Sequence, residues 1–177
     1  DSTFFNILLI MNFYYQIPLS LLLLISSLNS NASKLSEDAQ SRGINETCSS
    51  YLNQIEESYN LSGLNLTFVN PENPSSSPSL HVSSQKYNNG SSSFSATLTP
   101  DEERCYLSSI LVTSINNQSC SEIEQIKLEN DPTLKAASYL EGQYTVITPE
   151  NNSYQIILTS SGKESCTITD ARMMWPG

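Results

Sequence analysis

The single histidine of the chain, His81, is the first candidate for catalysis, because an imidazole can act as a general base near neutral pH. It lies in the segment Leu80-His81-Val82, which alternates apolar and polar residues as a half-buried strand does. Alternation turns the imidazole away from Leu80 and Val82, so we expect a surface histidine beside a serine-rich loop. No nucleophile elbow or serine–histidine–acid signature accompanies it. A small exported hydrolase using His81 is therefore the alternative interpretation, and a non-catalytic role is preferred.

The acidic run Asp101-Glu102-Glu103 is the second candidate for chemistry. With other carboxylates it can form a calcium site or the carboxylate pair of a glycosidase. The run follows Pro100 between two strand patterns, where a turn with solvated carboxylates is the simpler interpretation. No EF-hand loop, phosphate-binding loop or dinucleotide motif is present in the sequence. We therefore expect no catalytic residue and no cofactor.

Four cysteines offer a different chemistry, and they are Cys48, Cys105, Cys120 and Cys166. In an exported chain the default is disulfide formation. A metal site is not expected, because there is no Cys-x-x-Cys pair and a single histidine gives no second imidazole ligand. Four cysteines allow three pairings, and the sequence context of each cysteine is the evidence that can distinguish them.

The cysteines occur in two repeated contexts. Cys48-Ser49 and Cys120-Ser121 are each soon followed by a Gln-Ile pair, and similar strand patterns at 93–99 and 153–159 precede Cys105 and Cys166. This repeat predicts the structural disulfides Cys48–Cys105 and Cys120–Cys166. The local alternative is Cys105–Cys120 together with Cys48–Cys166. The chain-entropy gain is similar for all of these loops, so energy does not select between the two maps.

The beginning of the chain has the pattern of a signal peptide. The apolar run Ile17–Leu28 is followed by small residues that end at Ala32. We expect 1–32 to be a leader cleaved after Ala32, in which the residues before Met11 are not native. The alternative is a retained membrane anchor over Phe4–Leu28. Both interpretations place the remaining domain outside the cytoplasm, secreted or periplasmic.

The charge of the chain limits its partners. Eight Lys and Arg against 18 Asp and Glu give a formal net charge of −10. An acidic surface argues against nucleic acid and against anionic membranes as partners. The charge allows a protein partner without indicating one, and we expect no membrane contact once the leader is removed.

The elements that position the cysteines follow from the spacing of apolar residues. Between Cys48 and Tyr59 these residues recur as on one helix face. Leu64, Leu66 and Phe68 alternate with polar residues, which predicts a half-buried strand with its apolar side in the core. The polar segment 33–46 is expected to be a flexible mature N-terminus.

The second part of the chain repeats this order. Ser121 and Glu124 match a capping box at the start of a helix. Asp131-Pro132 indicates the start of a further helix that ends at Gly142, because proline favours the first helical position. Three strands are then expected at 143–148, 154–159 and 165–173.

The sequence thus predicts an α+β domain over 47–177, an antiparallel sheet with helices packed on one face and two disulfides. An alternative division is a tandem α-β-β-β repeat with boundaries 47–116 and 117–177. By elimination we expect a small exported, non-catalytic binding protein, such as an inhibitor of an envelope or extracellular protein. The loops 71–79 and 86–93 are its expected contact surface.

Overall fold

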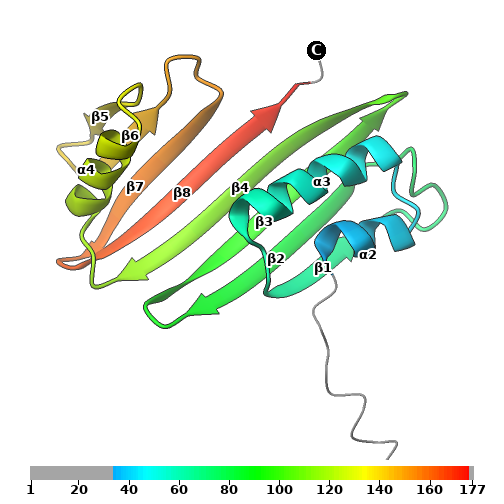
Figure 1. Cartoon of the computed structure of the whole chain (residues 1–177), viewed down its shortest axis with the longest axis horizontal. Coiled ribbons are helices and arrows are strands. Elements are labelled where there is room, and N and C mark those ends of the chain that lie inside the picture. Colours follow the sequence, from blue (N-terminus) through cyan, green and yellow to red (C-terminus); the bar gives the residue numbers. More distant parts are fainter. Residues whose placement is uncertain (1–33, 176–177) are drawn as a thin grey trace, which may run out of the picture. The chain divides into compact units, whose positions relative to one another are not determined.

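A computed structural model describes residues 34–175 of the chain (Figure 1). The predicted leader, its cleavage after Ala32 and the alternative anchor lie outside these residues. Within the described part, none of the helices combines the length and the hydropathy that crossing a bilayer requires.

The described chain forms three helices and eight strands, and the strands make one antiparallel sheet. The elements are α2 (Leu35–Ser41), α3 (Glu46–Tyr59), β1 (Leu64–Phe68), β2 (Ser79–Tyr87), β3 (Gly90–Asp101), β4 (Arg104–Asn116), α4 (Cys120–Asn130), β5 (Lys135–Tyr139), β6 (Tyr144–Thr148), β7 (Tyr154–Gly162) and β8 (Ser165–Met174). The strand order is β1-β2-β3-β4-β8-β7-β6-β5. An α+β chain with an antiparallel sheet and two disulfides is confirmed, and most of it is sheet.

The order of one helix followed by four strands occurs twice, where the sequence predicts repeats of three strands. We call residues 34–116 the N-terminal half and residues 117–175 the C-terminal half. They join through β4 and β8, which lie side by side in the middle of the sheet (Figure 1). Ile110 pairs directly with Ala171. The two residues occupy equivalent positions in the two halves, because Ile110 lies as far after Cys105 as Ala171 lies after Cys166. The register of the joint is therefore symmetric about the Ile110–Ala171 pair.

The helix α2 occupies half of the segment 33–46, which the sequence predicts to be flexible. Leu35 and Ala39 of α2 are completely buried, in the cluster that also contains residues of α3. The Glu56 carboxylate of α3 accepts hydrogen bonds from the backbone amide of Leu35, from the amide of Ser36 at 3.2 Å and from the Ser36 hydroxyl at 2.7 Å. These bonds satisfy free amides at the start of α2. The expectation for 33–46 is corrected because the stabilising group lies on another helix.

The predicted helix over 131–142 is wrong. The Asp131 side chain accepts from the Thr133 amide at 3.0 Å and from the Thr133 hydroxyl at 2.7 Å, which makes a turn instead of a helix start. The chain then continues as β5, whose five residues are exposed and pair with β6. Backbone pairing with a neighbouring strand thus overrides the helical spacing of the apolar residues.

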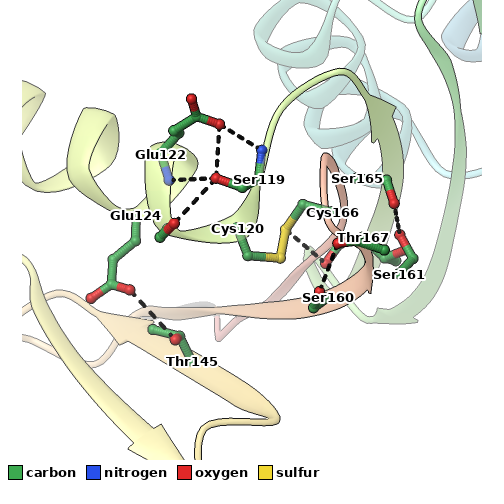
Figure 2. Close-up of a disulfide and its surroundings, with 12 residues drawn as sticks. Ser119, Cys120, Glu122, Glu124, Thr145, Ser160, Ser161, Ser165, Cys166 and Thr167 are labelled. Atoms are coloured by element: carbon green, nitrogen blue, oxygen red, sulfur yellow. Dashed lines mark hydrogen bonds between the residues drawn. A yellow bond between two sulfur atoms is a disulfide. The ribbon is translucent and has the colours of Figure 1, made fainter.

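The start of α4 is displaced by two residues from the predicted capping box. The Ser119 hydroxyl accepts from the Glu122 amide at 3.3 Å, and the Glu122 carboxylate accepts from the Ser119 amide at 2.7 Å (Figure 2). The pattern Ser-x-x-Glu occurs at 119–122 as well as at 121–124. The earlier copy caps the helix because Cys120 is its first residue.

The buried apolar residues form two clusters, one in each half. The N-terminal cluster includes Phe94, Leu98 and Leu107 from β3 and β4. The C-terminal cluster is smaller and consists of Ile123, Ile147, Ile156, Leu158 and Cys166. Each disulfide contributes to the cluster of its own half.

Candidate binding surface

Both disulfides tie a helix to the same face of the sheet. Cys48 in the first turn of α3 bonds to Cys105 of β4, and Cys120 of α4 bonds to Cys166 of β8 (Figure 2). Cys166 pairs across the ladder with Ile115, which lies on the same face as Cys105 because side chains alternate along a strand. The two pairings predicted from the repeated contexts are confirmed. We call the face that carries Cys105 and Cys166 the helix face, and the other one the open face.

On the open face, β1 exposes the residues that the sequence assigns to the core. Leu64, Leu66 and Phe68 are 65%, 47% and 55% exposed, and Leu80 of β2 is also exposed. The polar residues between them face the helices, and Thr67, for example, is buried. The prediction of a strand at 64–68 is confirmed, but the predicted direction of its apolar side is wrong. A strand pattern shows that the two sides differ, not which one a helix covers.

The open face carries almost no negative charge. Asp101 is the one carboxylate among the described strand residues that point to this side, and it pairs with Arg104 at 2.7 Å. The described strands contain one other carboxylate, Asp170 on the helix face, and the remaining acidic residues of the described part lie in helices, turns and loops. In a chain of net charge −10, this face is therefore distinct from the rest of the molecule.

A shallow groove of about 430 Å³ lies in the middle of the open face. Its lining comes from β3, β4, β7, β8 and the turn before β7, and we call it the central groove. Ile110 and Ala171, the symmetric pair of the β4–β8 joint, both line it. Because the C-terminal half has alanine where the N-terminal half has isoleucine, side-chain volume is missing on that side. Hydroxyl and amide groups border the groove, from Ser95, Thr97, Ser108 and Gln155.

His81 lies inside the protein, not at the surface as predicted. Its side chain is completely buried on the helix face, with Nε2 2.9 Å from Ser79 Oγ and Nδ1 3.3 Å from Thr67 Oγ1. Burial lowers the pKa of His81 to about 4, and the negative charge of Asp38 opposes this only in part. The imidazole is therefore neutral at pH 7 and inaccessible to a substrate. The prediction fails because the β1–β2 hairpin turns its polar side inward.

The acidic run at 101–103 forms the turn between β3 and β4. Glu102 has a φ of 56°, and Glu102 and Glu103 are exposed. Within residues 34–175, no three His, Cys, Asp or Glu side chains are grouped so that they could hold a metal ion. Segment 86–93, predicted as a loop, belongs mainly to β2 and β3, which are joined by a turn at 88–89.

A charged cluster at the junction of the two halves was not predicted from the sequence. Arg172 of β8 donates to both carboxylate oxygens of Asp170 at 2.9 Å. Its guanidinium also lies 5.1 Å from the ring centre of Tyr59 in α3 and 4.9 Å from that of Tyr154 in β7. Burial, followed by the charge of Asp170, raises the pKa of Tyr59. The spacing of Asp170 and Arg172 on a strand was the available signal, but Tyr59 is too distant in sequence to be linked to them.

Comparison with protein families, with curated proteins and with solved structures finds no match for this chain.

Proposed function

We propose that this protein is a small exported, non-catalytic binding protein that contacts another secreted or envelope protein through its open face. The observation that carries the proposal is the near absence of carboxylates on this face in a chain of net charge −10. Depleted charge together with exposed aromatic and aliphatic side chains is the composition found at the centre of protein interfaces. Exposed apolar patches of this kind mark interaction sites.

The compartment is part of the same proposal. Two disulfides, and no membrane-spanning helix within residues 34–175, fit an oxidising location such as the extracellular space or the periplasm. In such a location an inhibitor of an extracellular or envelope protein is the role we favour. Hydrolysis by His81 gains no support, because its ring is buried between Thr67 and Ser79.

The central groove is the proposed anchoring point for the partner. Binding energy concentrates where a side chain of the partner fills a depression and excludes water. Ala171 leaves such a depression beside Ile110, and the hydroxyl and amide groups around it can receive the polar groups of a partner. The earlier expectation of a contact surface at loops 71–79 and 86–93 thus gives way to the open face.

The test is affinity capture from the native compartment, carried out in parallel with three forms of the protein and followed by mass spectrometry. The forms are the native chain, Ala171→Phe, which fills the central groove, and Leu140→Asp as a matched control. Leu140 is 68% exposed and lies in the turn between β5 and β6, outside the strands and outside the lining of the central groove. It has a positive φ, which aspartate tolerates.

We expect a protein that the native chain and Leu140→Asp both capture and that Ala171→Phe captures at least about tenfold less. Circular dichroism and disulfide mapping confirm that each variant is folded. Equal capture by all three forms would contradict binding at the groove. No reproducible capture by the native chain would contradict the binding function itself.

A further inference from the structure

The outer end of the open face carries a continuous apolar surface, which we call the edge patch. It consists of Leu64, Leu66 and Phe68 of β1 with Leu80 and Val82 of β2. Leu66 pairs directly with Val82, and Phe68 pairs directly with Leu80, so the side chains adjoin across the two strands. Four of the five are exposed and Val82 is half-buried. Exposing them to water is unfavourable in proportion to their area, so a covering partner is stabilising.

The edge patch lacks the features that normally protect an edge. Among the described strands, β1 is the last of the sheet and pairs with β2 alone. Strand β1 contains no charged residue and no proline, whereas edge strands that avoid association usually carry one of these. At the opposite edge, β5 begins with Lys135, which pairs with Glu150 at 3.4 Å. The two edges therefore differ in the property that controls association.

The distribution of charge indicates what can cover the patch. A molecule of net charge −10 repels its own copies wherever acidic surfaces meet. Two copies that meet through their open faces avoid this repulsion, because both faces are nearly free of carboxylates and the acidic helices α3 and α4 point outward. A two-fold contact also requires that the patch be complementary to itself. An uncharged aliphatic and aromatic surface meets this requirement, and one of uniform charge does not.

We propose that a second copy of this chain covers the edge patch, with the two sheets packed face to face about a two-fold axis. Sheets packed in this way lie about 10 Å apart and interdigitate the side chains of their inner faces. Leu66 is the middle residue of β1, so the axis passes near it and each Leu66 contacts the patch of the other copy. The edge patch lies on β1 and β2 and the central groove on β3, β4, β7 and β8, so different residues carry the two proposals.

Sedimentation velocity of the exported, disulfide-intact protein over a series of concentrations tests this proposal. We expect a dimer that dissociates on dilution. Leu66→Asp should weaken self-association at least about 100-fold, because each copy brings one buried carboxylate into the contact. Leu140→Asp is the matched control, since it introduces the same charge at an exposed leucine outside the patch, and we expect it to dimerise like the native chain.

Three results would overturn the proposal. The first is a native chain that remains monomeric at every concentration. The second is a dimer that Leu66→Asp does not weaken, with circular dichroism showing both forms folded. The third is a monomer that loses a captured foreign protein when Leu66 is changed, which would assign the patch to a different partner. None of these depends on whether Ala171→Phe affects capture, so this proposal and the proposed function fail separately.

Discussion

The two halves of the molecule share a frame but differ in how much they bury. Both have a helix whose first turn carries a cysteine, four antiparallel strands, and a disulfide to the strand that forms the central joint. The N-terminal half adds α2 and buries the larger apolar cluster, whereas the C-terminal half has a small cluster and an exposed β5. The comparison indicates that helix, disulfide and joint specify the frame, while the amount of core is set separately in each half.

The same comparison explains the polar interior of the N-terminal half. Helix α2 contacts β1 and covers hydrogen-bonded polar residues, Thr67, Ser79 and His81, while the apolar residues of β1 face outward. The C-terminal half has no counterpart of α2 and no such buried polar group among its described residues. The half with the larger core therefore also carries the exposed apolar edge. This arrangement is expected if the edge has a role other than stabilising the fold.

Removing the disulfides one at a time should give the largest effects. The sequence separations, 57 residues for Cys48–Cys105 and 46 for Cys120–Cys166, give each a stabilisation of about 4 kcal/mol on the chain-entropy model. We expect the consequences to differ, because the C-terminal half buries fewer apolar residues and therefore depends more on its disulfide. Cys120→Ala with Cys166→Ala should open the C-terminal half alone, and Cys48→Ala with Cys105→Ala should weaken the N-terminal half without unfolding it.

Hydrogen exchange measured peptide by peptide separates these outcomes, together with urea unfolding of each variant. Equal loss of protection in both halves of both variants would show that the molecule unfolds as one unit. The two apolar clusters would then not stabilise the two halves separately.

Acidification should weaken the N-terminal half next. The pKa of His81 falls to about 4 from an ordinary value of 6.5, so between these values the unfolded chain binds a proton that the folded chain does not. Stability therefore decreases as the pH falls from about 6.5 to about 4, by about 3 kcal/mol from this residue. His81→Asn should remove this share of the pH dependence. Urea unfolding of both forms across the pH range measures it, and parallel curves would contradict the buried neutral imidazole.

Loss of the Glu56 carboxylate should release α2 from α3. We expect it to lower the free energy of unfolding by less than acidification does. Glu56→Ala removes an ionised acceptor shared by the Leu35 amide and the Ser36 amide and hydroxyl, and hydrogen bonds to a charged group are worth about 2 kcal/mol. Exchange of the α2 amides should increase while the C-terminal half stays protected. Glu57→Ala, an exposed neighbour on the same helix, is the control and should leave α2 unchanged. Unaltered exchange in Glu56→Ala would show that packing alone holds α2.

The smallest effect is expected at the junction between the halves. Arg172→Lys keeps the positive charge but loses the two parallel bonds to Asp170 and the planar contact with Tyr59 and Tyr154. We expect a loss of about 1 kcal/mol in the free energy of unfolding. The transition should also broaden, because the halves become less tightly coupled. A transition as sharp as that of the native chain would assign the coupling to the β4–β8 ladder.

The sequence predicts the features that depend on local pattern. The helix from Cys48, the strands near 64–68, 79–87 and 154–162, and both disulfides follow from spacing and from repeated contexts. It fails where a distant group decides the outcome. Helix α2 depends on Glu56, β5 depends on pairing with β6, and the burial of His81 depends on which face α2 covers.

The candidate binding surface could not be predicted for the same physical reason. The alternation of Leu64, Leu66 and Phe68 shows an apolar side, and core burial is the usual consequence of that pattern. Only the position of the helices reveals that this side is exposed. The central groove likewise requires the β4–β8 register, which brings Ala171 next to Ile110.

Hydroxyl-radical footprinting of the dilute, disulfide-intact protein tests the central claim most directly, because the proposed dimer requires that the apolar side of the β1–β2 hairpin face solvent in the monomer. We predict strong modification of Leu64, Leu66 and Phe68, and protection of Phe94, which is completely buried on the opposite face. On raising the concentration, a face-to-face dimer should protect Leu66 and Phe68. Protection of the three β1 residues at every concentration, including that at which the chain is monomeric, would contradict the account.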